Sequence, residues 1–174
     1  MLNNITPVVI SYNEQANIER TLQQLSWAGN VVVMDSFSTD QTQSICQQFS
    51  NVTFVQREFD DFSNQCAAAV SHPSINTNWV LSMDADYLVS ASFIQELTEL
   101  EPNDGVDAYR ASFVYCINGG PIGDSLYPPR IVLALKEKLS FSMDGHAHRR
   151  SVPGQIKNLQ NKILHDDRKP QTDW

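Results

Sequence analysis

The sequence lacks an apolar run long enough to cross a membrane, and it lacks a secretory signal. A membrane-spanning helix needs about 18 or more consecutive apolar residues, and no stretch of this 174-residue chain approaches that length. A secretory signal places a basic segment before its apolar core, whereas this chain begins Met-Leu-Asn-Asn. We therefore expect a cytoplasmic protein without a membrane-spanning helix or a secretory signal.

Cysteine is scarce and scattered. The three cysteines, Cys46, Cys66 and Cys116, lie far apart and form no C-x-x-C pair. Disulfide frameworks and structural zinc sites use closely spaced or paired cysteines. The spacing therefore favours buried free thiols in a reducing compartment.

Basic residues are few and unevenly distributed. The chain has 12 Lys and Arg against 20 Asp and Glu, a net charge of −8, which argues against a nucleic-acid partner. Residues 130–174 hold 9 of the basic residues and 5 acids, a net of +4, whereas residues 1–129 hold 3 and 15, a net of −12. The basic part is either a solvated face or a surface for an anion, such as a diphosphate or an anionic membrane.

A glycine-rich phosphate loop is also missing. The first expected strand is followed by Ser11-Tyr-Asn-Glu14, which matches neither G-x-G-x-x-G nor G-x-x-x-x-G-K. A dinucleotide-binding fold of the usual kind is therefore not expected. A phosphate bound without such a loop needs a cation, and in an acidic region this is most naturally a divalent metal held by Asp oxygens.

Strand and helix patterns alternate four times in the first 100 residues. We expect strands at 5–11, 31–34, 52–55 and 79–83, and helices at 14–27, 38–49, 61–70 and 92–100. Asn13, Ser38 or Thr39, and Ser92 are the expected helix caps. This alternation predicts crossover connections and a mostly parallel sheet with helices on both faces. Two further strands are expected at 107–116 and 130–135.

Three of the four expected strands end in polar clusters. These clusters are residues 11–14, residues 35–40 and the pair Asp84 and Asp86. Parallel sheets bind ligands at the carboxyl ends of their strands, so the clusters should converge. Two acids one residue apart are compatible with a strand-to-helix turn, a metal site or an aspartyl nucleophile.

The segments ISYNEQANIERTL, VVVMDSFSTDQT and WVLSMDADYLV, followed by HDDRKP, occur in an order and spacing that resemble the family-2 glycosyltransferases of the GT-A fold. Most closely they resemble the bacterial envelope branch related to lipopolysaccharide core β-glucosyltransferases. The resemblance implies one α/β GT-A Rossmann-like domain over residues 1–174. Residues 1–100 would bind the nucleotide-sugar, and residues 101–174 would form the acceptor and catalytic half. Related chains run on after the tail motif, which leaves open a short form or a truncated fragment.

The resemblance implies a nucleotide-sugar donor, with a UDP-sugar favoured, and a glycan or glycolipid acceptor. Tyr12 to Glu14 would flank the base and ribose, Asp35 would accept a hydrogen bond from the base, and Asp84 would meet the ribose or a metal-bound water. The implied donor-binding residues are Ser11, Tyr12, Asn13, Glu14, Asp35, Ser36, Gln65, Asp84, Ala85 and Arg168. Arg130, which follows two prolines, is a further candidate for contact with the donor phosphates or with the acceptor, and it is equally compatible with an ion pair to the acidic half.

The resemblance also implies a divalent ion, Mg²⁺ or Mn²⁺, on the diphosphate. Asp86 would ligate it, with Asp84 and His165 as further metal-site residues. Such an ion stabilises the charge that develops on the leaving group. Arg168 or Lys169 would meet phosphate oxygens, although residues 165–169 are also compatible with a solvated charged loop.

Inverting transfer needs a general base for the acceptor hydroxyl. Asp144 is the expected base, and His148 and His146 are the alternatives. Some relatives place a Glu near the position of His148. As non-catalytic alternatives, Asp144 begins an Asp-Gly turn and the two histidines have the H-x-H spacing of a zinc site.

Two other functions remain open from the residues. The D-x-D also resembles the aspartyl nucleophile of haloacid-dehalogenase-like phosphatases, with Asp166 and Asp167 as the later metal pair. Departures from the branch pattern favour a non-catalytic nucleotide-sugar-binding module. These are Tyr87 in place of an acid, and Cys66 and Ala67 after the glutamine.

Overall fold

The structure is a computed structural model, and it describes residues 1–101, 105–117, 119–123, 128–144 and 147–170, without the side chains of 143, 144, 147 and 148. The helices are α1 (Ile18–Gln24), α2 (Thr42–Cys46), α3 (Phe62–Val70) and α4 (Ala91–Glu99), with 3-10 turns at Leu2–Asn4 and Lys136–Lys138. The strands are β1 (Ile5–Ser11), β2 (Val31–Asp35), β3 (Val52–Gln56), β4 (Trp79–Asp84), β5 (Tyr87–Leu88), β6 (Val106–Ala111), β7 (Phe113–Ile117), β8 (Gly120–Pro121), β9 (Arg130–Leu135), β10 (Ser140–Asp144), β11 (Ala147–Ser151), β12 (Gln155–Asn158) and β13 (Ile163–His165).

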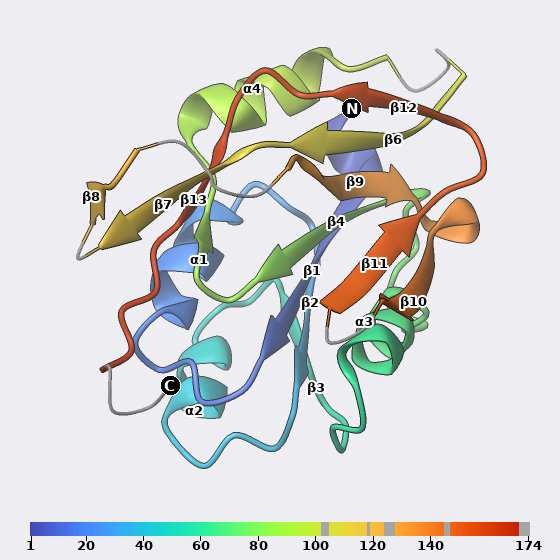
Figure 1. The fold of residues 1–174 in the computed structure, drawn as a ribbon. Coiled ribbons are helices and arrows are strands. Elements are labelled where there is room, and N and C mark those ends of the chain that lie inside the picture. The colour runs from blue at the N-terminus through green and yellow to red at the C-terminus, as the bar shows by residue number, and fades with distance from the viewer. Residues whose placement is uncertain (102–104, 118, 124–127, 145–146, 171–174) are drawn as a thin grey trace.

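Seven strands form the central sheet, in the order β12-β6-β9-β4-β1-β2-β3 (Figure 1). Strand β1 is parallel to both β4 and β2, and β2 is parallel to β3. Strand β9 is antiparallel to its neighbours β4 and β6. The predicted α/β fold with a mostly parallel sheet is therefore confirmed. The chain order reverses between β1 and β4, and open α/β sheets bind ligands at such a switch point.

Side chains that alternate along the strands divide the core into two layers. Val9 and Leu81 pack in one cluster with residues of α1, α2 and α4. Val8 and Val80 point to the opposite face and pack with Ala69 of α3. Burial of one Val or Leu side chain contributes about 1.5–3 kcal/mol, so both layers stabilise the sheet. Helices thus cover both faces, as predicted, with α1 and α2 on the left and α3 on the right of Figure 1.

The single strand expected at 107–116 is divided in two. Strand β6 belongs to the central sheet, whereas β7 joins a smaller sheet in the order β5-β13-β7-β8. The chain changes sheets at Ser112, whose carbonyl accepts a hydrogen bond from the N–H of Ile163. This exchange brings β13 to β5, and the chain after β13 then runs down beside α1 (Figure 1).

The expected caps of the first two helices are wrong. Asn13 has a φ of +51° and lies ahead of a turn, and α1 begins only at Ile18. Helix α2 is shorter than expected, and the side chain of Asp40, rather than Ser38 or Thr39, accepts the N–H of Thr42. The polar residues expected to cap helices instead link the loops after β1 and β2.

The N-cap of helix α4 lies two residues earlier in the sequence than expected. The hydroxyl of Ser90 accepts the backbone N–H of Phe93 at 3.1 Å, so Ser90 is the N-cap in place of Ser92. Helix α3 begins as predicted, because the carboxylate of Asp61 accepts the N–H of Asn64.

The three cysteines are free. Cys46 and Cys66 are buried, as expected, whereas Cys116 is only half-buried. Among the described residues, none of the helices has the length and apolarity that crossing a membrane would require.

Candidate active site

A cavity of about 690 Å³ opens at the carboxyl edge of the sheet, where β1 and β4 end. Ile10 and Asp84 are register partners in the β1–β4 pair, so the two strand ends contribute neighbouring walls. The volume lies within the range of about 300–1,000 Å³ that is usual for small-molecule sites. The described lining residues are Ile10, Ser11, Tyr12, Glu14, Ser36, Phe59, Phe62, Asp84, Ala85, Asp86 and Lys169.

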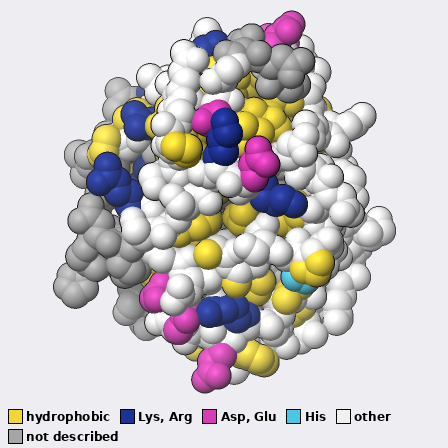
Figure 2. All heavy atoms as spheres, turned by 90° about the vertical axis from the view of Figure 1, so that its right-hand side faces the viewer, with side chains coloured by type: hydrophobic (Ala, Val, Ile, Leu, Met, Phe, Trp, Pro, Cys, Tyr) yellow, Lys and Arg dark blue, Asp and Glu magenta, His cyan; other side chains and the backbone are white. Residues whose placement is uncertain are grey.

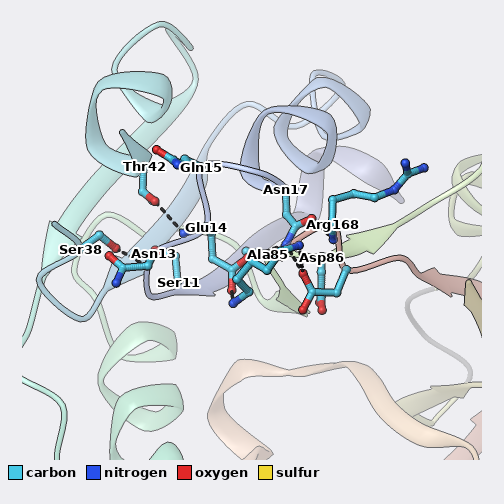
Figure 3. A network of polar contacts seen from close by, with 12 residues as sticks. Ser11, Asn13, Glu14, Gln15, Asn17, Ser38, Thr42, Ala85, Asp86 and Arg168 are labelled. Atoms are coloured by element: carbon cyan, nitrogen blue, oxygen red, sulfur yellow. Dashed lines mark hydrogen bonds and ion pairs between the residues drawn. The ribbon is translucent and has the colours of Figure 1, made fainter. Parts of the chain in front are cut away.

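Hydrogen bonds between the loops after β1 and β2 shape this cavity. The N–H of Asn13 donates to the hydroxyl of Ser38, and the N–H of Glu14 donates to the hydroxyl of Thr42, both at 2.8 Å (Figure 3). The amide oxygen of Asn13 accepts the N–H of Thr39 at 2.9 Å. Asn13 therefore acts as a loop organiser, and its left-handed conformation directs Glu14 toward the cavity.

Asp86 presents an unsatisfied carboxylate oxygen in the cavity wall. Its Oδ2 lies 2.8 Å from Nε2 of His165, whereas its Oδ1 is buried without a hydrogen-bond partner among the described residues. A buried carboxylate oxygen without a partner is costly, and a bound cation would satisfy it. Among the residues described, no group of three His, Cys, Asp or Glu side chains could hold a metal by itself. This incomplete donor set fits Mg²⁺ or Mn²⁺, because such ions are often completed by substrate phosphates and water.

His165 is brought to Asp86 by strand pairing, because it is the register partner of Tyr87 in the β13–β5 pair. Burial lowers the pKa of His165, but the hydrogen bond and charge of Asp86 outweigh burial and raise that pKa above 6.5. The His165 ring centroid lies 4.6 Å from that of Tyr115 and 5.3 Å from that of Tyr87. These contacts hold the imidazole against the D-x-D.

Asp166 fastens the C-terminal tail to the rest of the site. Its side chain is 3% exposed and accepts hydrogen bonds from Arg20 at 2.7 Å, Arg168 at 2.9 Å and the N–H of Gly119 at 3.0 Å. Its own N–H donates to the carbonyl of Asp86. Burial raises the pKa of Asp166, but these hydrogen bonds outweigh burial and lower it below 3.8. The tail is therefore part of the site and is not a solvated loop.

Asn17 joins the tail to the loop after β1. Its amide nitrogen donates to Glu14 and to Asp167, both at 2.8 Å, and its amide oxygen accepts the N–H of Arg168 at 2.8 Å. Figure 3 shows Asn17 between Glu14 and Arg168, close to Asp86. Asn17 was not expected at the site, because in the sequence it is one polar residue at the start of a helix.

Lys169 and Glu14 form an ion pair on the cavity wall. The ammonium group of Lys169 lies 2.5 Å from Oε1 of Glu14, and both residues line the cavity. Burial raises the pKa of Glu14 above 4.5, and the hydrogen bonds from Lys169 and Asn17 offset only part of that rise. Burial lowers the pKa of Lys169, but the bond to Glu14 outweighs it and raises that pKa above 10.5. Lys169 thus provides a fixed positive charge in the same cavity as Asp86.

Asp35 and Gln65 lie behind the cavity wall. Asp35 is fully buried, and its carboxylate accepts hydrogen bonds from Ser11, Ser38 and Gln56. Gln65 is also fully buried, and it donates to the hydroxyl of Ser36 at 3.0 Å. Both residues therefore position lining residues, Ser11 and Ser36, rather than line the cavity themselves.

The two arginines expected to bind the donor do not line the cavity. Arg168 is paired with Asp166, and Arg130 lines a separate groove. His146 and the side chains of Asp144 and His148 lie outside the described residues. The backbone of Asp144 ends β10, where it pairs with Ala147 of β11.

Two aromatic residues of the cavity were missed in the sequence. Phe59 and Phe62 line it with side chains 45% and 49% exposed, and their ring centroids lie 5.1 Å apart in an edge-to-face arrangement. They lie at the junction of a loop and α3, where no periodicity points to a site. The motif F-D-D-F, in which two aromatics flank two acids, is the signal that could have identified an exposed aromatic pair.

Residues 6–154 match the family model described as glycosyl transferase family 2. Several solved structures are similar in fold. S. aureus TarS 1–349 in complex with UDP-GlcNAc has a TM-score of 0.71 and 15% identity, over 96% of this chain and 59% of that one. Glucosyl-3-phosphoglycerate synthase from Mycobacterium tuberculosis, in complex with Mn²⁺, UDP and phosphoglyceric acid, has a TM-score of 0.62 and 16% identity, over 98% and 73%.

A third similar structure is the mannosyltransferase PcManGT from Pyrobaculum calidifontis in complex with GDP-Man and Mn²⁺. Its TM-score is 0.54 and its identity 26%, over 62% of this chain and 35% of that one. The chain thus spans about three fifths of the TarS fragment that it matches. These likenesses confirm the predicted GT-A fold. Because the family match covers most of the chain and includes both strand ends of the cavity, the chain belongs to glycosyl transferase family 2.

Proposed function

We propose that this chain transfers a sugar from a nucleotide-diphosphate sugar to a hydroxyl of a glycan or glycolipid of the bacterial envelope, with inversion at the anomeric carbon. The observation that carries the proposal is the cavity at the β1–β4 switch point, which Asp84, Asp86 and Lys169 line together. Similar structures hold UDP-GlcNAc, UDP with Mn²⁺, or GDP-Man with Mn²⁺. A UDP-sugar is the favoured donor, and the lipopolysaccharide branch follows from the sequence resemblance.

Residues 1–100 would bind the donor. Tyr12, Phe59 and Phe62 give one part of the cavity an exposed aromatic surface, on which a base can stack. Asp84 at the end of β4 would accept a hydrogen bond from the ribose or from a metal-bound water. Asp35 would act on the base through the loop it organises, because its oxygens already accept hydrogen bonds within the protein.

The diphosphate would lie between Asp86 and Lys169. Asp86 would hold Mg²⁺ or Mn²⁺ through its unsatisfied Oδ1, with Asp84 and His165 as further metal-site residues. A bound divalent ion stabilises the negative charge of the departing diphosphate. Lys169 adds a second positive charge on the same wall, and Glu14 and Asn17 hold its tail segment in place.

The transfer itself requires a proton acceptor in residues 101–174. The acceptor oxygen would bond to the anomeric carbon while the bond from that carbon to the diphosphate breaks, and the hydroxyl proton would pass to the base. Asp144 remains the proposed base, with His148 and His146 as alternatives. A cytoplasmic location, with peripheral contact at the inner face of the plasma membrane, completes the proposal.

The phosphatase alternative loses support at its second acidic pair. Asp166 accepts hydrogen bonds from two guanidinium groups and one N–H, so it has little capacity left for a metal. The family match supports a glycosyltransferase instead. The non-catalytic module differs from the proposal in one observable, which is turnover.

The test compares the chain with its Asp86→Ala variant. Calorimetric titration with UDP should show binding that depends on Mn²⁺ in the wild type, and the variant should lose this dependence. Release of UDP from a panel of UDP-sugars then measures turnover. Equal, metal-independent binding by both proteins would overturn the metal-assisted mechanism. Binding of UDP without turnover of any nucleotide-sugar in the presence of envelope acceptors would favour the non-catalytic module.

A further inference from the structure

A second groove, of about 570 Å³, lies apart from the cavity just described and has a strongly basic lining. Four arginines contribute to it from three different strands: Arg110 of β6, Arg130 of β9, and Arg149 and Arg150 of β11. Its other described lining residues are Pro128, Pro129, Ile131, Ser151, Val152 and Ile156, and none of these is acidic.

Strand pairing brings these arginines together. In the β6–β9 pair, Arg110 is the register partner of Ile131, and Arg130 is the partner of Ala111. Strand β9 is antiparallel to β4, so Arg130, its first residue, lies toward the edge of the sheet where β4 ends in Asp84. The groove therefore opens near the same sheet edge as the donor cavity.

Two of these arginines have no acidic partner among the residues that the structure describes. The side chains of Arg110 and Arg149 are exposed and make no ion pair or hydrogen bond within the part of the chain that the structure describes. In the space-filling view, described acidic side chains lie beside the basic ones nearer the middle, and no described acid adjoins the basic group on the left (Figure 2). Guanidinium groups held close together without acids repel one another, and an anion would remove that cost.

Arg150 connects the groove to the donor site. Its Nη1 donates to the carbonyl of Ile131 at 3.0 Å, and its Nε is buried with no partner in the part of the chain that the structure describes. Burial raises the pKa of the Cys66 thiol. The charge of Arg150 lowers that pKa and the charge of Asp84 raises it, so Arg150 and Asp84 both lie near this thiol. A buried guanidinium N–H without an acceptor among the described residues is costly, so Arg150 keeps one donor that the described part of the chain does not use.

We propose that this groove binds an anionic group, a phosphate or a carboxylate, of the sugar acceptor. The proposal rests on the proposed function and adds the chemical class of the acceptor. The planar fork of arginine matches the paired oxygens of phosphate and carboxylate groups, and the two exposed forks, of Arg110 and Arg149, suit such a group best. The donor's diphosphate has its own cation in Lys169, so the groove is available to the second substrate.

The test measures binding of inorganic phosphate and of glucose 6-phosphate by NMR, from the Nε–Hε signals of arginine. The titration is run in EDTA, and again with the donor cavity filled by UDP and Mg²⁺. Saturable shifts should appear at groove arginines under both conditions.

The double variant Arg110→Gln/Arg149→Gln should weaken binding about tenfold, because it removes two charge-assisted contacts. The matched control Lys157→Gln/Lys162→Gln also removes two positive charges, but neither residue lines the groove, and its affinity should change less than twofold.

Equal weakening in both double variants, or shifts that never saturate, would overturn the groove as a site. A lipid headgroup could supply the same phosphate, so binding to phosphatidylglycerol and phosphatidylcholine vesicles is measured in parallel. Loss of vesicle binding in the arginine variant, with no change for glucose 6-phosphate, would overturn the acceptor assignment. Failure of UDP to bind in the same samples would count against the proposed function alone, because phosphate binding in EDTA does not depend on it.

Discussion

The Nε2 atom of His165 lies 2.8 Å from Oδ2 of Asp86, although 79 residues separate them along the chain. The same tail segment also reaches Glu14 through Lys169. The short strand β13 therefore places the histidine beside Tyr87 and the D-x-D, and the segment that follows carries Lys169 to Glu14. The cavity at the ends of β1 and β4 is formed jointly by the loop after β1 and the tail segment after β13, and several predictions depend on that junction.

Asp166→Asn should destabilise the fold by about 2 kcal/mol. The substitution removes the charge of a buried carboxylate that pairs with two partly exposed arginines, Arg20 and Arg168. The folded state lowers the pKa of Asp166, so its contribution to the free energy of unfolding is fully present well above pH 3.8. It is lost as the pH falls through the folded-state pKa. Urea unfolding of both proteins should show a constant difference from pH 5 to 8 that shrinks below about pH 3.8.

The control is Asp60→Asn, which breaks an exposed pair with Arg57. It should cost much less than Asp166→Asn does, because water screens an exposed ion pair. If the two variants were equally stable, the tail would not be anchored by Asp166.

Gly119→Ala should destabilise the fold more than Gly105→Ala does. Both glycines have positive φ, +82° and +69°, so both alanines carry a similar backbone cost of about 1 kcal/mol. A Cβ at Gly119 would in addition displace the guanidinium of Arg168, whose Nε donates to Asp166, whereas a Cβ at Gly105 would meet nothing within 4 Å. Thermal unfolding measures the difference, and identical melting temperatures would contradict the close approach of the tail to Gly119.

Lys169→Gln should weaken the binding of UDP about tenfold and leave the binding of uridine nearly unchanged. The charge of Lys169 acts on phosphate oxygens, which uridine lacks. Calorimetry with both ligands measures the contrast, and Lys162→Gln, outside the cavity lining, is the control. Parallel weakening for UDP and uridine would assign Lys169 a structural role through Glu14 instead.

Asp144→Asn should keep the affinity for the nucleotide-sugar and cut turnover by about 10²–10⁴, because proton transfer to the base occurs only in the transition state. Initial rates of UDP release and donor titrations separate the two quantities. Normal turnover in this variant would move the role to His148 or His146. In that case the pH–rate profile should bend near the histidine reference pKa of about 6.5 rather than near 4.

The sequence by itself determined the central sheet and the cavity at its edge. Side chains alternate along a strand with a period of two, so apolar runs such as Val31–Met34 can only be buried on both faces. Parallel strands also bring their carboxyl ends to one edge. For this reason Ser11, at the end of β1, and Asp84, at the end of β4, could be expected at one cavity before any coordinates were known.

Only the tertiary structure decided how the C-terminal residues complete the site. Nothing local in His-Asp-Asp-Arg-Lys distinguishes a solvated loop from an anchored tail, because the difference lies in partners such as Asn17, which is 150 residues from Asp167. The basic groove has the same origin, since Arg110 and Arg149 meet only after β6, β9 and β11 are assembled. Such contacts depend on strand order and register, which no local pattern of residues encodes.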